Sequence, residues 1–159
     1  ATDHAGNSRT TTAHYRVVPY QPDASVRRGA DGRLVGNGVY NLTGDGQTRF
    51  ATVRPGDQVN YYVRLDNDGL VDDAITVRGT AGDDEFGVSY FHGRRDVSAM
   101  VKAGTYHVAD LAPGEQRVIR VAVRARGTAG FGASHTVRIT ASSTGEPAAV
   151  DAVTAITRT

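Results

Sequence analysis

The stretch Pro55–Gly69, which reads PGDQVNYYVRLDNDG, constrains the fold of the chain most strongly. Proline followed by glycine supplies the fixed φ and the positive φ that the central positions of a type II turn need. Apolar and polar residues then alternate, which is the period of a strand with one buried face. The apolar face carries Val59, Tyr61, Val63 and Leu65, and an Asn-Asp-Gly turn closes the segment. We therefore predict a half-buried strand between two turns.

A second segment, Pro113–Gly127, repeats this pattern with the sequence PGEQRVIRVAVRARG. Ile119, Val121 and Val123 lie on its apolar side, and arginines lie on the other. We predict that both segments are strands in the core of a β-sandwich.

The rest of the chain consists of short strand signals between turns. The whole chain contains 19 glycines and no long apolar stripe of helical period. Regularly spaced turn signals of this kind are typical of an all-β, immunoglobulin-like Greek-key sandwich of roughly seven to nine strands. The predicted strands are Asp23–Arg28, Phe50–Val53, Gln58–Asp66, Ala74–Arg78, Gly87–His92, Thr105–Val108, Arg117–Arg126, Ser134–Ala141 and Ala149–Ile156. A single helical turn is predicted over Asp96–Lys102.

Composition excludes several classes of function. The 159 residues suffice for one domain, or for one domain with an appendage. The absence of cysteine excludes disulfides, thiol catalysis and thiolate metal sites. A formal net charge of +1 gives no drive toward nucleic acid, and no segment has the roughly 18 apolar residues of a membrane span. No signal peptide is recognised, so we expect any export signal to lie upstream or to have been removed.

Residues 1–18 do not resemble the start of a domain. Ser8–Val18 alternates like a long strand, and the preceding pattern ATD-x-AGN resembles the last hairpin of immunoglobulin-like domains in secreted bacterial proteins. A strand without a sheet is not stable in water. Three arrangements remain open: the strand pads its own sandwich, inserts into a neighbouring copy as a donated strand, or belongs to a missing upstream domain.

The positions of proline and glycine predict the linker, the sandwich and one long loop. Residues 19–22, PYQP, predict a short stiff linker, and residues 23–159 predict the sandwich. Within it, Gly29–Arg49 is too polar and too rich in glycine to be core. Val39 and Tyr40 are the residues we expect to hold this loop against the sandwich.

About residues 22–159 resemble a module that recurs in large secreted bacterial proteins. The motifs that carry the resemblance are PD-x-SVRR, VGNGVYNLTGDGQTR, V-x-PGD, YYVRLDNDG, ITVRGT, LAPGEQRVIRVAV and a final TVRITASS with DAV. They are similar to those of the CARDB and DUF11 group of immunoglobulin-like domains. The resemblance implies spacers, stalks and assembly units, and it brings no catalytic residues.

Candidate catalytic residues do not form a recognised pattern. The five histidines, His4, His14, His92, His107 and His135, lack the spacing of a zinc site. Ser134–His135 is a dipeptide without a nucleophile elbow. The carboxylate runs Asp72–Asp73 and Asp83–Glu85 are poor acid/base pairs, because neighbours on an extended backbone point apart. We assign no catalytic, cofactor-binding or metal-binding residue and expect no enzyme activity.

Calcium is the alternative cofactor for part of these carboxylates. Asp66, Asp68, Asp72 and Asp73 surround one strand-to-strand turn, and calcium takes oxygen ligands from loops. The turn lacks the spacing of a calcium-binding loop, and turn-forming Asp and Asn residues explain it equally.

Three further sequence features have both a functional and a purely structural explanation. Arg64, Arg78, Arg120, Arg124 and Arg138 are candidates for a basic stripe that contacts anionic glycans or cell-wall polymers, although a solvated strand face explains them as well. Lys102, the only lysine, is either a surface residue or the lysine of an intramolecular isopeptide bond. Asn41-Leu42-Thr43 is a glycosylation sequon.

The sequence thus favours a structural or assembly module of an extracellular or cell-surface bacterial polymer. Its expected partners are other copies or neighbouring immunoglobulin-like domains. In its most specific form, the hypothesis is that the chain is a filament subunit and that the subunits are linked by strand donation. The alternative is a glycan- or protein-binding accessory module of a larger secreted enzyme or adhesin.

Overall fold

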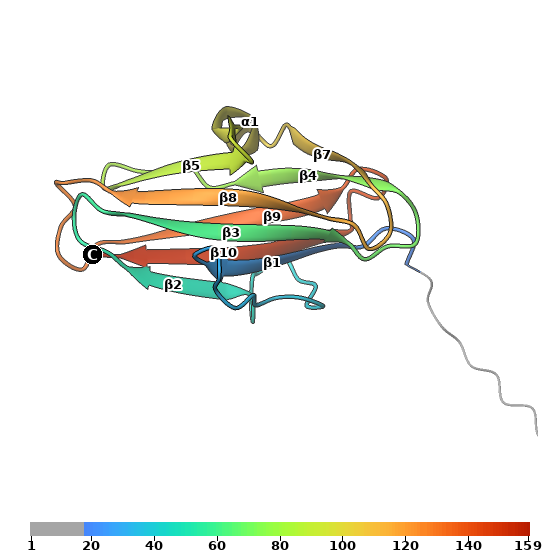
Figure 1. The fold of residues 1–159 in the computed structure, drawn as a ribbon, viewed down its shortest axis with the longest axis horizontal. Helices are drawn as coiled ribbons and strands as arrows, with labels where there is room; N and C mark the ends of the chain where they lie inside the picture. Colours follow the sequence, from blue (N-terminus) through green and yellow to red (C-terminus); the bar gives the residue numbers. More distant parts are fainter. Residues whose placement is uncertain (1–17) are drawn as a thin grey trace, which may run out of the picture.

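The computed structural model describes residues 18–159, which form two five-stranded sheets packed face to face (Figure 1). The predicted strand Ser8–Val18 therefore lies outside the described residues, except for Val18, which is not in a strand. The elements are β1 (Pro22–Arg28), β2 (Thr48–Thr52), β3 (Gln58–Asn67), β4 (Asp73–Gly79), β5 (Phe86–His92), β6 (Arg95–Asp96), α1 (Ser98–Ala103), β7 (Tyr106–Leu111), β8 (Gln116–Ala125), β9 (Ser134–Ser143) and β10 (Val150–Arg158). Among these residues no helix has the length and apolar character needed to cross a bilayer.

The strand order is that of an immunoglobulin sandwich of the constant type. The first sheet has the order β1-β3-β8-β5-β6 and the second β2-β10-β9-β4-β7. Strands β1, β3, β8 and β5 correspond to A, B, E and D, and strands β10, β9 and β4 to G, F and C. The predicted all-β, immunoglobulin-like fold is confirmed. Two additions extend it: β2, which pairs in parallel with β10, and the β6–α1–β7 segment, in which β7 pairs with β4.

The nine predicted strands are all present, with ends displaced by a few residues, and the predicted helical turn appears as α1. Strand β6 was not predicted. It pairs only two residues with β5, which is too short for any periodic signal.

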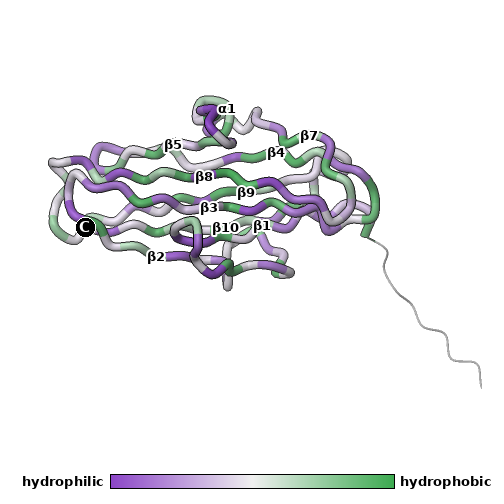
Figure 2. The backbone as a smooth tube through the Cα atoms, viewed as in Figure 1, coloured by the Kyte–Doolittle hydropathy of each residue, from purple (hydrophilic) through white to green (hydrophobic). Residues whose placement is uncertain are grey.

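Strands β3 and β8 form the centre of the first sheet. They pair antiparallel, with Tyr61 opposite Val121 and Val63 opposite Ile119, and these four side chains are fully buried. Tyr62, on the other face of β3, is half-buried, and Figure 2 shows the same alternation of hydrophobic and hydrophilic residues along the strands. Each fully buried aliphatic side chain contributes about 1.5–3 kcal/mol, so this face is a large part of the stability. The predicted core position of both strands is confirmed.

The two Pro-Gly turns take the predicted geometry. Gly56 and Gly114 have φ values of 90° and 79°. In each turn the N–H three residues on donates back: Asp57 N–H to the Arg54 carbonyl (3.0 Å), and the equivalent bond closes the second turn at 2.9 Å. A side chain at either glycine would be strained, because L-residues rarely adopt positive φ.

Residues 29–47 form an insertion between β1 and β2, and its anchoring agrees with the prediction only in part. Val39 and Tyr40 are 38% and 44% exposed, so neither is a buried anchor, but the Tyr40 hydroxyl donates to Asp68 Oδ2 (2.8 Å) and connects the loop to the β3–β4 turn. Gln47 is fully buried instead, and the Val26 and Val35 backbones exchange two hydrogen bonds along β1. Val35 packs against the core, and the rest of the attachment comes from buried polar groups that are hydrogen-bonded to the sandwich.

One hydrogen bond between the sheets gives a direct test of this packing. The Tyr61 hydroxyl of β3 donates to the Ile156 carbonyl of β10 (2.9 Å) and lies 3.0 Å from Thr157 Oγ1. We expect Tyr61→Phe to lower the free energy of unfolding by about 1–2 kcal/mol, because it leaves a buried carbonyl without this donor. Urea denaturation measures the change. Tyr62→Phe, one residue along and facing outward, is the matched control and should change stability by less than about 0.5 kcal/mol; equal losses in both variants would contradict the assignment.

Candidate functional site

The linker is bound to the end of the sandwich at which it enters. The Asp68 N–H donates to the Gln21 carbonyl and the Leu70 N–H donates to the Pro19 carbonyl, both at 2.9 Å. Gly69, between these donors, approaches so closely that a Cβ would lie 2.4 Å from the Pro19 oxygen. The linker therefore continues the sheet hydrogen bonding onto the β3–β4 turn, and its direction is fixed.

Tyr20 anchors the linker from its other side. A Cβ on Gly145, in the β9–β10 hairpin, would lie within 2.2 Å of the Tyr20 ring, so the ring packs directly on backbone. Any larger residue at this position would displace the ring. The linker is thus held between the β3–β4 turn, which connects the two sheets, and the β9–β10 hairpin of the second sheet.

Asn67 stabilises the turn that receives the linker. Its side-chain N–H groups donate to the carbonyls of Val71 and Leu111, both at 2.8 Å, and its Oδ1 accepts from Gly69 N–H at 3.0 Å. Asn67 is buried, and every polar atom of its side chain is paired. The Asn-Asp-Gly sequence therefore closes β3 as predicted and also joins the turn to the end of β7.

Asp151 joins three segments beneath the insertion. Its carboxylate is fully buried and accepts hydrogen bonds from the N–H groups of Ala24 (2.7 Å), Asn41 (3.0 Å) and Ala152 (2.8 Å) and from Gln47 Nε2 (2.7 Å). These donors belong to β1, the insertion and β10 itself. Hydrogen bonds to a charged acceptor are about twice as strong as neutral ones, so this carboxylate is the main attachment of the insertion to the sandwich.

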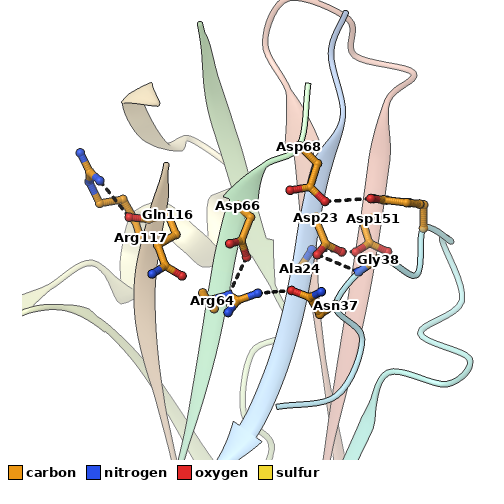
Figure 3. Close-up of polar contacts among 11 residues, drawn as sticks. Asp23, Ala24, Asn37, Gly38, Arg64, Asp66, Asp68, Gln116, Arg117 and Asp151 are labelled. Carbon is orange, nitrogen blue, oxygen red and sulfur yellow. Dashed lines mark hydrogen bonds and ion pairs between the residues drawn. The ribbon is translucent and has the colours of Figure 1, made fainter. Parts of the chain in front are cut away.

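Asp23 is a second buried carboxyl group close to Asp151. Figure 3 shows it near Asp68 and Asp151, with Asp66 on the adjacent strand β3. Its Oδ2 accepts from Gly38 N–H (3.0 Å), while Oδ1 is buried without a partner among the described residues. Burial raises the pKa of Asp23 to about 7; the Gly38 amide opposes this rise, and the charges of Asp68, Asp151 and Asp66 add to it.

Two further contacts complete this network. The Tyr40 hydroxyl donates to Asp68 Oδ2 (2.8 Å), and burial together with this carboxylate raises the pKa of Tyr40. Arg64 Nε donates to Asp66 Oδ2 (2.7 Å), which partly offsets the rise that burial causes in the pKa of Asp66. The insertion and the β3–β4 turn are therefore tied together on the outer side of β1.

A hollow of about 470 Å³ opens beside the linker. It is lined by Val18, Pro19, Tyr20, Gln21, Pro22, Tyr40, Glu146, Ala148, Ala149 and Val150. Leu70, next to the linker contact, is 63% exposed, and Leu42 of the insertion is 61% exposed. This end of the molecule thus presents a concave surface with apolar side chains around it, which is a suitable contact for a neighbouring domain.

The sheet edges differ in how far they are closed. At β5, the outward backbone groups of Phe86 and Tyr90 are paired with Asp83, Val97 and Ser98. At β2, the Gln47 carbonyl accepts from Thr154 N–H and the Val53 N–H donates to the Arg158 carbonyl. The backbone groups of the odd-numbered residues therefore face β10, and those of the even-numbered residues face away from it.

The outward-facing residues of β2 are Thr48, Phe50 and Thr52. Within residues 18–159 their backbone groups have no further partner, and the Phe50 side chain is 58% exposed. An open edge of this kind can accept an additional strand.

The three histidines of the described residues each contact a different partner. His92 contacts the Tyr106 hydroxyl (2.6 Å), His107 the Thr76 hydroxyl (2.9 Å) and His135 the Asp83 carboxylate (2.6 Å). His4 and His14 lie outside the described residues. Among residues 18–159, no three His, Asp or Glu side chains are arranged to hold a metal ion.

The carboxylates and Ser134 are also dispersed. Of the calcium candidates, Asp66 and Asp68 lie beside Asp23, whereas Asp73 is buried and its Oδ1 accepts from the Ala74 and Gly145 N–H groups and the Thr144 hydroxyl. Asp72 is exposed. Ser134 is exposed while His135 is buried, so the two do not form a nucleophile and its base.

Asp83, with Asp84 and Glu85, lies in the β4–β5 loop. Its carboxylate accepts from the N–H groups of Phe86 (2.7 Å) and Glu85 (2.9 Å) and contacts His135. Partial burial acts to raise the pKa of Asp83, but these hydrogen bonds together hold it below the usual value. The carboxylate therefore closes its own loop.

The arginines do not form one stripe. Arg64, Arg120 and Arg124 belong to the first sheet, whereas Arg78 and Arg138 belong to the second, so of the two explanations the single basic stripe does not hold.

Lys102 is half-exposed in α1, not enclosed in the core as an isopeptide bond requires. The side chain of Asn41 accepts from three backbone N–H groups and the Thr43 hydroxyl, and it donates to the Asp45 carbonyl (3.0 Å). The sequon is therefore part of the folded insertion.

Sequence reasoning did not single out Asp23, Gln47 or Asp151. Each lies at a strand start or in a polar loop, where a carboxylate or amide is ordinarily solvated. A signal was present nevertheless, since all three fall within the motifs PD-x-SVRR, GDGQTR and DAV that carry the family resemblance.

No protein-family model matches the chain, and no curated protein matches it. Among solved structures it is similar to the protease VesB from Vibrio cholerae, with 18% identity, a TM-score of 0.41, and coverage of 70% of this chain and 29% of that one. The N-terminal domain of PorA gives 13% identity and a TM-score of 0.42, with coverage of 85% and 96%. A family 123 glycoside hydrolase from Clostridium perfringens gives 8% and 0.44, with coverage of 87% and 27%. The chain spans less than a third of the protease and of the hydrolase, and likenesses this distant say nothing of activity.

The buried Asp23 carboxyl should make stability depend on pH. Its pKa is about 7 in the folded chain and about 4 when unfolded. The contribution of this carboxyl group to the free energy of unfolding is therefore complete below pH about 4 and is lost as the pH rises to about 7. Asp23→Asn removes this loss. We expect the stability of the variant relative to the natural chain to rise by about 1.4 kcal/mol per pH unit across this interval and to level off above it.

Urea denaturation at pH 4.5, 6 and 8 measures this dependence. Asp31→Asn, an exposed carboxylate in the insertion, is the matched control and should leave the pH profile unchanged. Parallel profiles for Asp23→Asn and the natural chain would show that Asp23 titrates normally.

Proposed function

We propose that this chain is a non-catalytic structural and assembly module of an extracellular bacterial protein, connected to neighbours through its two ends. One observation carries the proposal: the linker enters at one end of the long axis, and β10 ends at the opposite end (Figure 1). Modules connected in this way extend an assembly by their own length. The resemblance of residues 22–159 to modules of secreted bacterial proteins supports the extracellular setting.

The fixed linker supports a mechanical role. Its two backbone hydrogen bonds and the Tyr20–Gly145 contact leave little freedom for a hinge within residues 19–22. A stalk or spacer needs such a junction, because a free linker would let successive domains reorient.

The direction of the terminal strands also suits tension. β1 leaves the linker and runs toward the far end, and β10 runs the same way and ends there (Figure 1). Pulling on the two ends would slide β1 along β3 and β10 along β9, so the seven and nine residue pairs of these ladders would be loaded together. Bonds loaded together resist more force than bonds that open one at a time.

The finer form of the proposal is a filament subunit linked by strand donation. The outward backbone of β2 at Thr48, Phe50 and Thr52 is the edge that a strand from another copy would extend. Ser8–Val18, with the alternation of a strand, is the segment we propose as donor. Self-capping by the same segment and packing against an upstream domain are the competing arrangements.

Strand donation makes a defined prediction for assembly. We expect the natural chain to form multiples of 16.8 kDa in light scattering and linear particles in negative-stain images. Deleting residues 1–17 should leave a folded monomer, because the donor is gone. Phe50→Pro should do the same, because it removes an outward N–H that no intramolecular bond uses.

Phe50→Ser is the matched control, since it removes the apolar ring and keeps the N–H group. It should still assemble, at higher protein concentration. Assembly that survives both the deletion and Phe50→Pro would rule out donation to β2, and a monomeric natural chain would favour self-capping or an upstream domain.

A further inference from the structure

A basic hollow lies on the outer face of the second sheet. It has a volume of about 360 Å³ and is lined by Arg78, Gly79, Thr80, Ala81, Lys102, Arg138 and Thr140. These residues come from β4 and the turn after it, from β9, and from α1. Three of the seven carry a positive charge and none carries a negative charge.

The sheet register places the two arginines side by side. Arg78 pairs with Thr140, and the Thr80 N–H donates to the Arg138 carbonyl (3.1 Å). Arg78 and Arg138 are therefore diagonal neighbours on adjacent strands and project from the same face, within reach of each other's long side chains. Like charges in this position repel, which disfavours the arrangement unless an anion offsets it.

Lys102 supplies the third charge from α1. The stem of Arg78 packs against Gly104, where a Cβ would lie 3.3 Å from Arg78 Cδ, so the end of α1 is held beside the arginine. Gly104 has a φ of 73° and ends the helix. The only lysine of the chain thus stands beside two arginines of the neighbouring sheet.

The three cations are not neutralised within the described residues. The ion pairs of residues 18–159 are Arg64–Asp66, Arg117–Glu115 and His135–Asp83, and none involves the hollow. The Arg138 side chain donates one hydrogen bond, to the Thr43 carbonyl (3.0 Å), which leaves its other guanidinium N–H groups free to bind. The charge of Lys102 acts on one carboxylate, Asp96, whose pKa is lowered mainly by its hydrogen bonds with Ser98 and also by Lys102. Asp96 is fully exposed on β6.

We propose that this hollow binds sulfate or phosphate groups carried on an anionic polysaccharide. Guanidinium groups present planar forks of N–H donors that match such oxyanions, and lysine adds a point charge. The hollow is open to solvent, so it cannot enclose a small molecule as ligand cavities do, but it can accept a group projecting from a polymer laid on the sheet. This inference does not rest on the proposed assembly role, because the hollow belongs to a single chain.

Isothermal titration with a heparin-derived hexasaccharide at 20 mM NaCl tests the proposal, with amide chemical shifts of Gly79, Thr80 and Thr140 reporting the place of binding. We expect Arg78→Gln and Lys102→Gln each to weaken binding about tenfold, because each removes hydrogen bonds to a charged group. Binding should weaken strongly at 150 mM NaCl, where screening acts within about 8 Å.

Arg124→Gln is the matched control, since it removes the same charge from an exposed position on the other sheet. It should change affinity by less than about twofold. Equal weakening in Arg124→Gln and Arg78→Gln, or no binding at low salt, would overturn the proposal.

Three further probes separate the sources of the anion. A neutral dextran oligosaccharide should not bind, and inorganic phosphate should bind weakly with shifts at the same amides. Two results would contradict the glycan assignment. One is that phosphate binds but the hexasaccharide does not, and the other is that a single-stranded DNA oligonucleotide binds more tightly than the hexasaccharide through the same residues. Unchanged melting temperatures of the variants establish that the losses are not due to unfolding, and Lys102→Gln, which breaks no intramolecular hydrogen bond among the described residues, keeps the test valid if Arg78→Gln is unstable.

Discussion

The attachment of the insertion to the sandwich depends on one buried carboxylate. Val35 of the insertion packs against the core, but most of the segment is glycine and polar residues, so its backbone polar groups must find partners or remain in water. Asp151 provides these partners, accepting N–H groups from the insertion, from β1 and from its own strand. A buried carboxylate is costly unless it is fully hydrogen-bonded, and with four donors the cost is offset. β1 and β10 belong to different sheets, so the same group also closes the sandwich along this side.

Much of the fold is readable from the sequence, because its strongest determinants are local. Val59 to Leu65 alternate over a full strand, and Pro55-Gly56 and Pro113-Gly114 encode turns through their own φ preferences. Strand order follows less directly, but repeated half-buried strands allow few arrangements, of which the immunoglobulin sandwich is a common one.

The linker end could not be predicted in the same way. Its contacts join residues far apart in the chain, such as Tyr20 with Gly145 and Asp151 with Ala24, and no periodic pattern records such pairs. Gln47 illustrates the difficulty: an amide in a polar, glycine-rich loop has the composition of a solvated residue, and only the approach of Asp151 makes it a buried one. The basic hollow was missed for the opposite reason, since the arginines were noticed but their assignment to two sheets depends on topology.

The contact between the Tyr20 ring and the Gly145 backbone has a geometric consequence for any array of these modules. In an array whose junctions are fixed in the way that residues 19–22 are, each junction has the same relative rotation, and repeating one rotation and one translation generates a helix. The pitch and handedness of such an array would then be inherited from the way one aromatic ring rests on one glycine. A single methyl group at position 145 would change the twist accumulated over many modules while leaving each module's own core intact.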